Sequence, residues 1–256
     1  MDKQEIINKV IQKKELSRLP KKDVEAAFGK FDKKIYSDEE KVKLTRELLH
    51  KIYGAFVSRK LLKLKDKPME WILRKHLSTR ERLLSYEEIY SRVLKGLKEI
   101  SVIDLGAGVN GFSYAYFRNS GFDVEYLGIE AIGQLVDLMN SYFKKEKIKG
   151  KALHVSLFDL DRIKNLIKET KKPRIVFLFK TLDSLELLQR NYSKKLILEI
   201  APFTERIVVS FATESMTKRK RFKIRRTWII YFIEKNFRVL NDFESKGERY
   251  IVFGKK

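Results

Sequence analysis

The sequence predicts an α/β fold, in which a doubly wound, mostly parallel sheet follows an all-helical N-terminal domain. From residue 99 onward, short apolar segments alternate with amphipathic helical segments, the pattern of successive strand-helix-strand units. Before that residue, apolar side chains recur only at helical spacing, as Ile6, Ile7 and Val10 do. We therefore expect residues 1–98 to form a helical domain and residues 99–256 to form the sheet domain.

The composition limits the chemistry that the chain can perform. Its 256 residues contain no cysteine, which excludes disulfides, thiolate metal sites and a cysteine nucleophile. No apolar run of about 18 residues is present, and the first residues alternate charges where a signal peptide would have an apolar core. We expect a cytoplasmic monomer without a bound metal.

The charge predicts a polyanionic partner. The chain has 56 basic and 34 acidic residues, a formal net charge of +22. Abundant Lys and Glu without cysteine would also suit a thermophilic protein, although ion-pair networks require charges closer to balance. Residues 1–98 hold 26 basic and 15 acidic residues, so the charge is denser there. This density favours a substrate-docking module, with a solvated helix bundle as the alternative.

A basic cluster marks the start of the last helix of this domain. Ser78 and Glu81 have the spacing of a capping box, which predicts a helix over residues 79–98. The box does not account for His76, Arg80 and Arg82 beside it. We expect these side chains to contact an anionic group, either a carboxylate of a ligand or an RNA phosphate.

The first strand of the sheet domain leads into a glycine-rich turn. The strand ends at Asp104, and Gly106, Gly108 and Gly111 follow. Glycine lets the backbone approach a nucleotide-like ligand and adopt a positive φ. Both NAD and S-adenosylmethionine (SAM) are bound by such turns. The Asp104 carboxylate would repel the pyrophosphate of NAD but suits the sulfonium and ammonium groups of SAM, so the pattern favours SAM.

Two acidic residues follow the next strands. Glu130 ends the second strand, where an acid accepts hydrogen bonds from ribose hydroxyls in either class of cofactor. Asp159 comes just after the third strand and would accept from the adenine amino group, with Leu160 against the ring. Asp159 is also suited to cap the helix that follows it.

The end of the fourth strand predicts a substrate-facing site. Lys180 is too polar for a core position and follows an apolar strand directly. Glu186 lies in the next helix, where it could pair with Lys180. The Asn/Asp-Pro-Pro-Tyr/Phe motif that holds an exocyclic amine is absent, which disfavours methylation of adenine or cytosine amino groups.

A strongly basic run follows the fifth strand. Seven basic residues fall within nine positions, interleaved with Phe222. They are Lys218, Arg219, Lys220, Arg221, Lys223, Arg225 and Arg226. Positive charge with an aromatic side chain is typical of an RNA-facing loop. A helix over residues 227–236 and a closing hairpin should then complete a sheet of seven strands.

The chain resembles the 16S rRNA (guanine-N7) methyltransferases associated with aminoglycoside resistance. The resemblance spans nearly the whole sequence and rests on five blocks in the same order, of which residues 76–82 are the most specific. The blocks are residues 50–56, 76–82 and 104–111, Lys180-Thr181-Leu182 with Glu186, and residues 209–215 with the basic run. The chain differs from the family's usual residues at Ala107, Glu130, Asp183 and Ala212.

The resemblance implies a Rossmann-like class I SAM-dependent methyltransferase that acts on small-subunit rRNA. It implies that the cofactor is bound by His76, Arg82, Asp104, Gly106, Ala107, Gly108, Glu130, Asp159, Leu160, Thr181 and Leu182. Lys180 and Glu186 would orient a flipped base, and Arg80 with the basic run would contact RNA. The extreme basicity suggests a thermophilic archaeal relative. The alternatives are a ribose 2′-O-methyltransferase or another methyltransferase, and an RNA-binding protein with an inactive methyltransferase fold.

Overall fold

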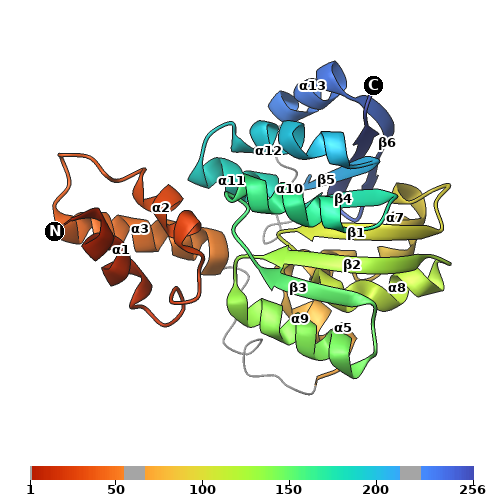
Figure 1. Cartoon of the computed structure of the whole chain (residues 1–256), viewed down its shortest axis with the longest axis horizontal. Coiled ribbons are helices and arrows are strands. Elements are labelled where there is room, and N and C mark those ends of the chain that lie inside the picture. Colours follow the sequence, from red (N-terminus) through yellow and green to blue (C-terminus); the bar gives the residue numbers. More distant parts are fainter. Residues whose placement is uncertain (1, 55–66, 214–225) are drawn as a thin grey trace.

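The computed structural model describes residues 2–54, 67–213 and 226–256, and its centre is a sheet of seven strands (Figure 1). The strands are β1 (Glu99–Leu105), β2 (Asp123–Glu130), β3 (Gly150–His154), β4 (Arg174–Phe179), β5 (Arg206–Ala212), β6 (Arg238–Ser245) and β7 (Glu248–Gly254). Their order is β3-β2-β1-β4-β5-β7-β6, with β7 antiparallel to both neighbours and the other pairings parallel. The predicted seven-stranded α/β sheet and its closing hairpin are confirmed.

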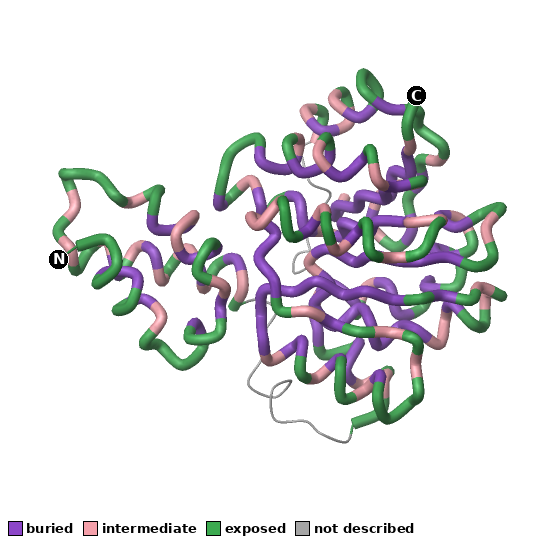
Figure 2. The backbone as a smooth tube through the Cα atoms, viewed as in Figure 1, coloured by how far each residue is buried: buried purple, intermediate pink, exposed green. Residues whose placement is uncertain are grey.

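Apolar side chains alternate between the two faces of the strands. Val102 and Phe177 belong to the core on one face, whereas Ile103 and Leu178 belong to the core on the other. Because both faces are apolar, the sheet requires a layer of helices on each side. Figure 2 shows the buried backbone running through the strands between these layers.

Helices of the sheet region divide between the two faces. Helices α8 (Tyr114–Asn119) and α9 (Gly133–Lys145) pack on one face, while α10 (Leu160–Glu169), α11 (Leu182–Leu188), α12 (Tyr192–Ile200) and α13 (Thr227–Asn236) pack on the other. The helix predicted over residues 227–236 is therefore confirmed. None of the helices in the described ranges is long and apolar enough to cross a membrane.

The N-terminal helices lie at the edge of the sheet to which the parallel strands point (Figure 1). They are α1 (Lys3–Ile11), α2 (Lys21–Phe28) and α3 (Asp38–Tyr53). Three more helices, α5 (Met69–Lys75), α6 (Leu77–Arg82) and α7 (Tyr86–Val93), precede β1. In an open α/β sheet, ligands bind outside the carboxyl ends of the strands. The N-terminal helices therefore stand beside the expected ligand site.

The single helix predicted over residues 79–98 is wrong, because the chain forms α6 and α7 there. The capping box also fails to form. Ser78 Oγ accepts a hydrogen bond from the Arg82 guanidinium at 2.6 Å, and the Glu81 carboxylate pairs with Lys180. Both side chains that would have capped the helix are thus recruited by charged groups of the site.

Candidate active site

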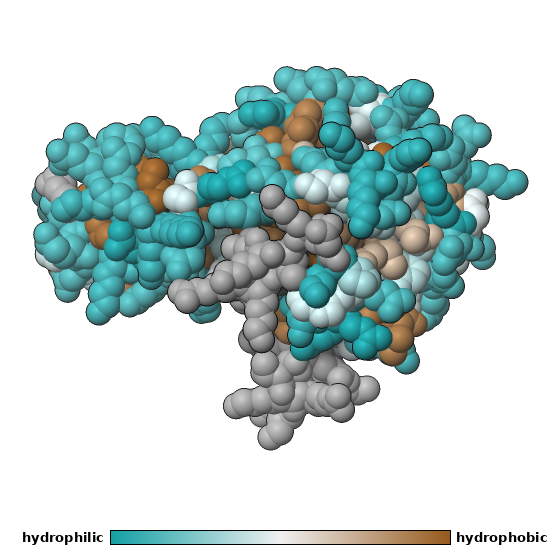
Figure 3. Space-filling model, turned by 90° about the horizontal axis from the view of Figure 1, so that it is seen from below, coloured by the Kyte–Doolittle hydropathy of each residue, from teal (hydrophilic) through white to brown (hydrophobic). Residues whose placement is uncertain are grey.

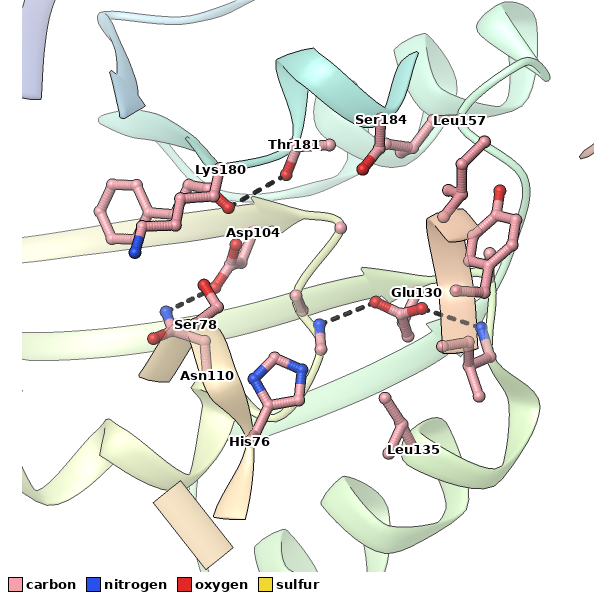
Figure 4. A pocket seen from close by; sticks show the side chains of 18 of the residues that line it. His76, Ser78, Asp104, Asn110, Glu130, Leu135, Leu157, Lys180, Thr181 and Ser184 are labelled. Carbon is pink, nitrogen blue, oxygen red and sulfur yellow. Dashed lines mark hydrogen bonds between the residues drawn. The ribbon is translucent and has the colours of Figure 1, made fainter. Parts of the chain in front are cut away.

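A cavity opens at the carboxyl edge of β1, β2 and β4 (Figure 4). Nine predicted site residues line it, namely His76, Arg82, Asp104, Gly106, Ala107, Gly108, Glu130, Lys180 and Thr181. The chain runs from β1 to β2 on one side and returns to β4 on the other. The cavity therefore lies at the point where the strand order reverses, the usual ligand site of such sheets.

The glycine turn after β1 forms one wall of the cavity. Gly106 and Gly108 have φ angles of +77° and +55°, a conformation that only glycine adopts without strain. A Cβ atom at Gly106 would lie 2.7 Å from Thr181 Oγ1, and one at Gly108 would lie 2.8 Å from His76 Nε2. The turn thus needs glycine both for its conformation and for the close approach of its neighbours.

The Asp104 carboxylate links the segment after the turn to β2 through hydrogen bonds. Its Oδ2 accepts hydrogen bonds from Asn110 Nδ2 and from the Tyr126 hydroxyl, each at 2.7 Å. Burial raises the pKa of the Asp104 carboxyl, and these two donors only partly offset that effect. Asn110 in turn accepts from Arg82 at 3.1 Å and from the Tyr86 hydroxyl at 2.9 Å. The carboxylate predicted to face the cofactor therefore also organises the backbone that forms the wall.

Glu130 lies across the cavity from the Lys180 end (Figure 4). Its two carboxylate oxygens accept backbone hydrogen bonds from Gly108 at 2.7 Å and from Ile132 at 2.9 Å. Burial raises the pKa of the Glu130 carboxyl to about 7, although the backbone donors counteract this. Each oxygen keeps a lone pair, so Glu130 can accept further hydrogen bonds from a ligand hydroxyl.

Lys180 occupies the opposite end of the cavity (Figure 4). It has a φ of +56°, which is uncommon for a residue with a side chain, directly after β4. Its ammonium pairs with Glu81 and lies 3.2 Å from Glu248 Oε2. The predicted pairing of Lys180 with Glu186 is wrong. Glu186 instead accepts from the backbone N–H groups of Asn191 at 2.6 Å and Ser193 at 2.9 Å, where it stabilises the start of α12.

Glu248 connects the two basic residues of this end. Glu248 is fully buried on β7. Its carboxylate accepts hydrogen bonds from Arg82 Nε at 3.2 Å and from the Ser210 hydroxyl. Burial alone would raise the pKa of Glu248, but the charges of Arg82 and Lys180 hold it below its usual value. Arg82, predicted to contact an anionic ligand, is thus already paired with a carboxylate of the protein.

His76 is neutral in this arrangement. Burial, with repulsion from Arg82 and Lys180, lowers the pKa of the imidazole to about 3. The basic cluster predicted around residue 76 therefore loses one of its cations. Arg80 is exposed on α6 and stays available to an anionic partner.

A family of ribosomal RNA methyltransferases, FmrO, matches residues 63–227 of the chain. This is more than half of the 256 residues. The chain belongs to this family. The prediction of a ribosomal RNA methyltransferase is confirmed at the level of the family.

Two curated proteins of the same name are similar to the chain. A 16S rRNA (guanine(1405)-N(7))-methyltransferase of Micromonospora rosea is 28% identical over 201 residues, which are 70% of this chain and 69% of that protein. The Proteus mirabilis protein of that name is 28% identical over 122 residues. This second match spans 37% of the chain and only 43% of the relative's length.

Solved structures show the same fold. The 16S rRNA methyltransferase RmtF, in complex with S-adenosyl-L-homocysteine, is similar with a TM-score of 0.80 and 21% identity over 100% of both chains. The 16S rRNA methylase RmtB has a TM-score of 0.78 and 19% identity over 100% of this chain and 99% of its own. The predicted class I SAM-dependent methyltransferase fold is confirmed.

Some predicted cofactor residues do not reach the cavity. Asp159, Leu160 and Leu182 are not among its lining residues, and Asp159 pairs with Lys22 of α2 at 2.8 Å. The wall near them is formed by Leu157, which precedes the predicted pair, and by side chains of α11. Those side chains are Ser184, Leu185 and Leu188, and their helical spacing after Lys180 is a signal that could have identified them.

Most of the predicted RNA-binding loop lies outside the described residues. The six predicted RNA-binding residues that are not described are Lys218, Arg219, Lys220, Arg221, Lys223 and Arg225. Arg226 is described, and its guanidinium pairs with Asp183 at 2.7 Å and donates to the Ala212 carbonyl at 2.8 Å. It therefore has protein partners close to the cavity, in contrast to the predicted phosphate contact.

The N-terminal helices add residues that the sequence did not predict. Asp23 of α2, with Ile52 and Tyr53 of α3, lines the same cavity as Glu130. Arg18 also packs against α9, where its guanidinium lies 2.6 Å from Asp137. No local pattern marks Asp23, because it reaches the cavity only through the packing of the helices against the sheet.

Proposed function

We propose that the chain transfers a methyl group from SAM to N7 of a guanine in the 16S rRNA of the small ribosomal subunit. Family membership and the two relatives named as 16S rRNA (guanine(1405)-N(7))-methyltransferases support the reaction. The observation that carries the proposal is the single cavity with the glycine turn and Glu130 at one end and Lys180 at the other.

The described residues fit SAM at the first of these ends. The turn offers a backbone wall that no side chain at residues 106 or 108 could share, and Glu130 offers acceptors for ribose hydroxyls. Apolar side chains of Leu157, Leu185 and Leu188 suit the adenine ring. We place the methionine end of the cofactor along residues 106–108, with Asp104 and Thr181 behind them.

The chemistry requires alignment more than proton transfer. SAM, when bound, supplies a methyl group on a positively charged sulfur. Guanine N7 has an exposed lone pair and no proton, so no residue needs to act as a base. In this proposal Lys180 and its partner Glu81 orient the base, while the buried side chains around them exclude water. Glu81 takes the position that was predicted for Glu186.

A ribose 2′-O-methyltransferase is the less favoured alternative. That reaction needs a general base, and the ionisable residues after β4 that could supply one are Lys180, Asp183 and Glu186. Lys180 pairs with two carboxylates, Asp183 pairs with Arg226, and Glu186 accepts from the backbone of α12. An inactive RNA-binding protein is the other alternative, and it predicts no measurable affinity for SAM.

The N-terminal helices support docking on RNA. A groove on them is lined by four basic residues and two acidic ones, namely Lys9, Lys13, Lys43, Arg46, Glu39 and Glu47. On the face of the molecule that Figure 3 shows, the surface is mostly hydrophilic. Basic side chains along a groove contact phosphates without reading sequence. We propose that this surface, Arg80 and the basic run after β5 position the small subunit over the cavity.

Three finer predictions remain proposals. The division into a docking domain of residues 1–98 and a catalytic domain of residues 99–256 is supported by the uneven charge. A thermophilic archaeal origin is supported by the charged, cysteine-free composition. A monomer is the simplest state for a protein that docks on a subunit.

Labelling with tritiated SAM tests the function. The purified chain is incubated with naked rRNA, 30S subunits and 70S ribosomes, and modified nucleosides are identified by mass spectrometry. We expect 7-methylguanosine in 16S rRNA. Methyl groups on ribose would favour the 2′-O alternative, and binding of RNA without any SAM affinity would favour the inactive protein.

A further inference from the structure

Asp23 is a buried carboxylate that the N-terminal helices contribute to the cavity. It lies on α2, its exposed fraction is 2%, and it lines the cavity together with Tyr53 of α3. It is remote in sequence from every other acidic residue of the cavity. A buried charge normally requires a hydrogen-bond or ion-pair partner, so the groups around the Asp23 carboxylate indicate its role.

Among the described residues, hydrogen bonds engage only one oxygen of Asp23. Oδ1 accepts a hydrogen bond from the Tyr53 hydroxyl at 2.5 Å. Oδ2 is inaccessible to solvent and has no hydrogen-bond partner within the described part of the chain. Burial raises the pKa of the Asp23 carboxyl, and the nearby hydroxyls of Ser156 and Tyr53 offset this only in part.

Neighbouring cations on the same segment do not compensate this charge. Lys22 pairs with Asp159 at 2.8 Å and Arg18 pairs with Asp137 at 2.6 Å. The carboxylates of Asp159 and Asp137 are both more exposed than that of Asp23, so these cations pair with acids that water already solvates. Oδ2 of this cavity-lining residue is left with its hydrogen-bonding capacity unused.

Asp23 and Glu130 line the same cavity. The negative charge of Asp23 also contributes to the raised pKa of the Glu130 carboxyl. Both oxygens of Glu130 accept only from backbone N–H groups. Two carboxylates that line one cavity suit a ligand that presents two hydroxyl donors.

We infer that Asp23 is a cofactor-binding residue whose Oδ2 accepts a hydrogen bond from one ribose hydroxyl of the cofactor, while Glu130 accepts from the other. The inference rests on the proposed function, because it requires a nucleoside at the glycine turn. It adds a second role for the N-terminal helices. They complete the cofactor site as well as offering a docking surface.

Binding measurements on the full chain test this inference. Calorimetry compares S-adenosylhomocysteine with its 2′-deoxy and 3′-deoxy analogues, using the wild type and Asp23→Asn. The substitution keeps the shape of the side chain and an acceptor for Tyr53 but replaces the free oxygen with a donor. We expect Asp23→Asn to weaken binding about tenfold, as expected when a charged hydrogen-bond acceptor is lost.

The analogues identify the hydroxyl. The wild type should lose about tenfold in affinity for the analogue that lacks the hydroxyl on Asp23, and Asp23→Asn should lose nothing further for it. Asp137→Asn is the matched control, because it removes an exposed contact between the same two regions without touching the cavity. Its affinity should stay within about twofold of the wild type.

Each outcome separates the two hypotheses. A wild type that binds no S-adenosylhomocysteine contradicts the proposed function itself. If the wild type binds and Asp23→Asn binds equally well but unfolds at a lower temperature, Asp23 only anchors Tyr53 and the inference is wrong. Should the variant not fold, NMR of wild-type protein with carbon-13-labelled aspartate decides. The Asp23 carboxyl resonance must shift when S-adenosylhomocysteine is added, and a constant resonance overturns the inference.

Discussion

The two ends of the cavity are built from different kinds of interaction. At the glycine turn, conformation and backbone hydrogen bonds define the wall, and the carboxylates of Asp104 and Glu130 accept from uncharged donors. At the Lys180 end, four charged side chains from three separate segments contact one another. At the first end, few backbone conformations allow all of these hydrogen bonds to form. At the second end, the buried charges are stable only while each cation has a carboxylate partner.

Under the proposed function, this difference suits the two ends to different tasks. A wall of backbone atoms presents fixed dipoles, which suit a site that binds the same cofactor in every reaction cycle. A balanced set of charges can exchange partners when a base and its phosphate enter. Glu81, whose side chain is 22% exposed, is the member of that set nearest to solvent. We expect it to be the first partner that a substrate displaces.

The largest effect should follow from breaking the charged end. Glu248→Ala leaves Arg82 and Lys180 buried without their shared carboxylate, so the free energy of unfolding should fall by about 3–5 kcal/mol. Urea denaturation measures it. The matched control is Asp242→Ala, which removes the more exposed pair with Arg249 and should cost less than about 1 kcal/mol. Equal losses would show that burial does not distinguish the two pairs.

The glycine turn should respond to a single methyl group. Gly106→Ala combines an unfavourable positive φ with a contact against Thr181, so unfolding should become easier by about 2–3 kcal/mol. Gly121→Ala is the control, because its φ is +81° and a Cβ there meets nothing within 4 Å. It should cost only about 1 kcal/mol. Similar thermal unfolding of both variants would mean that conformation alone requires glycine.

The Glu130 end should be sensitive to pH. Because burial raises the pKa of Glu130 to about 7, its carboxyl is partly protonated near neutrality. A ribose hydroxyl favours the ionised form, so affinity for S-adenosylhomocysteine should rise from about pH 6 to 8, up to about tenfold per unit below the pKa. Calorimetry across this range measures the rise, which Glu130→Gln should abolish.

The stability of the cofactor-free protein should change with the opposite sign. In the folded state the pKa of Glu130 is about 7, above its ordinary value of 4.5. Between these two pH values the folded state therefore binds more protons than the unfolded state. The free energy of unfolding should therefore fall as the pH rises from 4.5 to about 7. Asp23, whose pKa is also raised, contributes in the same direction.

The smallest effect should come from Glu186. Its carboxylate accepts from two backbone N–H groups at the start of α12, so Glu186→Ala should cost about 1 kcal/mol of stability. Methylation activity, once corrected for folded protein, should stay near that of the wild type. Glu81→Gln should by contrast lower activity without changing cofactor affinity. A loss of activity in Glu186→Ala alone would restore the role first predicted for it.

Local features of the site could be predicted from the sequence. The glycine turn and the acid at the end of β2 depend on residues close together in the chain, and both line the cavity. Asp104 was assigned to the cofactor because it ends the first predicted strand and its carboxylate suits the positive charges of SAM. That its oxygen would accept from Asn110 and Tyr126 depends on a neighbouring strand, which the alternation of apolar residues does not specify.

Contacts that depend on the arrangement of helices and strands could not be predicted. Arg82 and Glu248 are 166 positions apart, and β7 brings them together only because it pairs antiparallel with β5. The pairing of Lys180 with Glu81 has the same origin, since it joins α6 to the end of β4. Asp23 reaches the cavity through the packing of α2, for which no residue spacing is a signal.

The insertion of β7 between β5 and β6 also determines when the site can first assemble during protein synthesis. The glycine turn, Lys180 and Arg82 all leave the ribosome before Glu248 is translated. Until then, Arg82 lacks the carboxylate of Glu248, and Lys180 can pair only with Glu81. A nascent chain can therefore form its parallel strands early, but the substrate end becomes complete only when β7 enters the sheet.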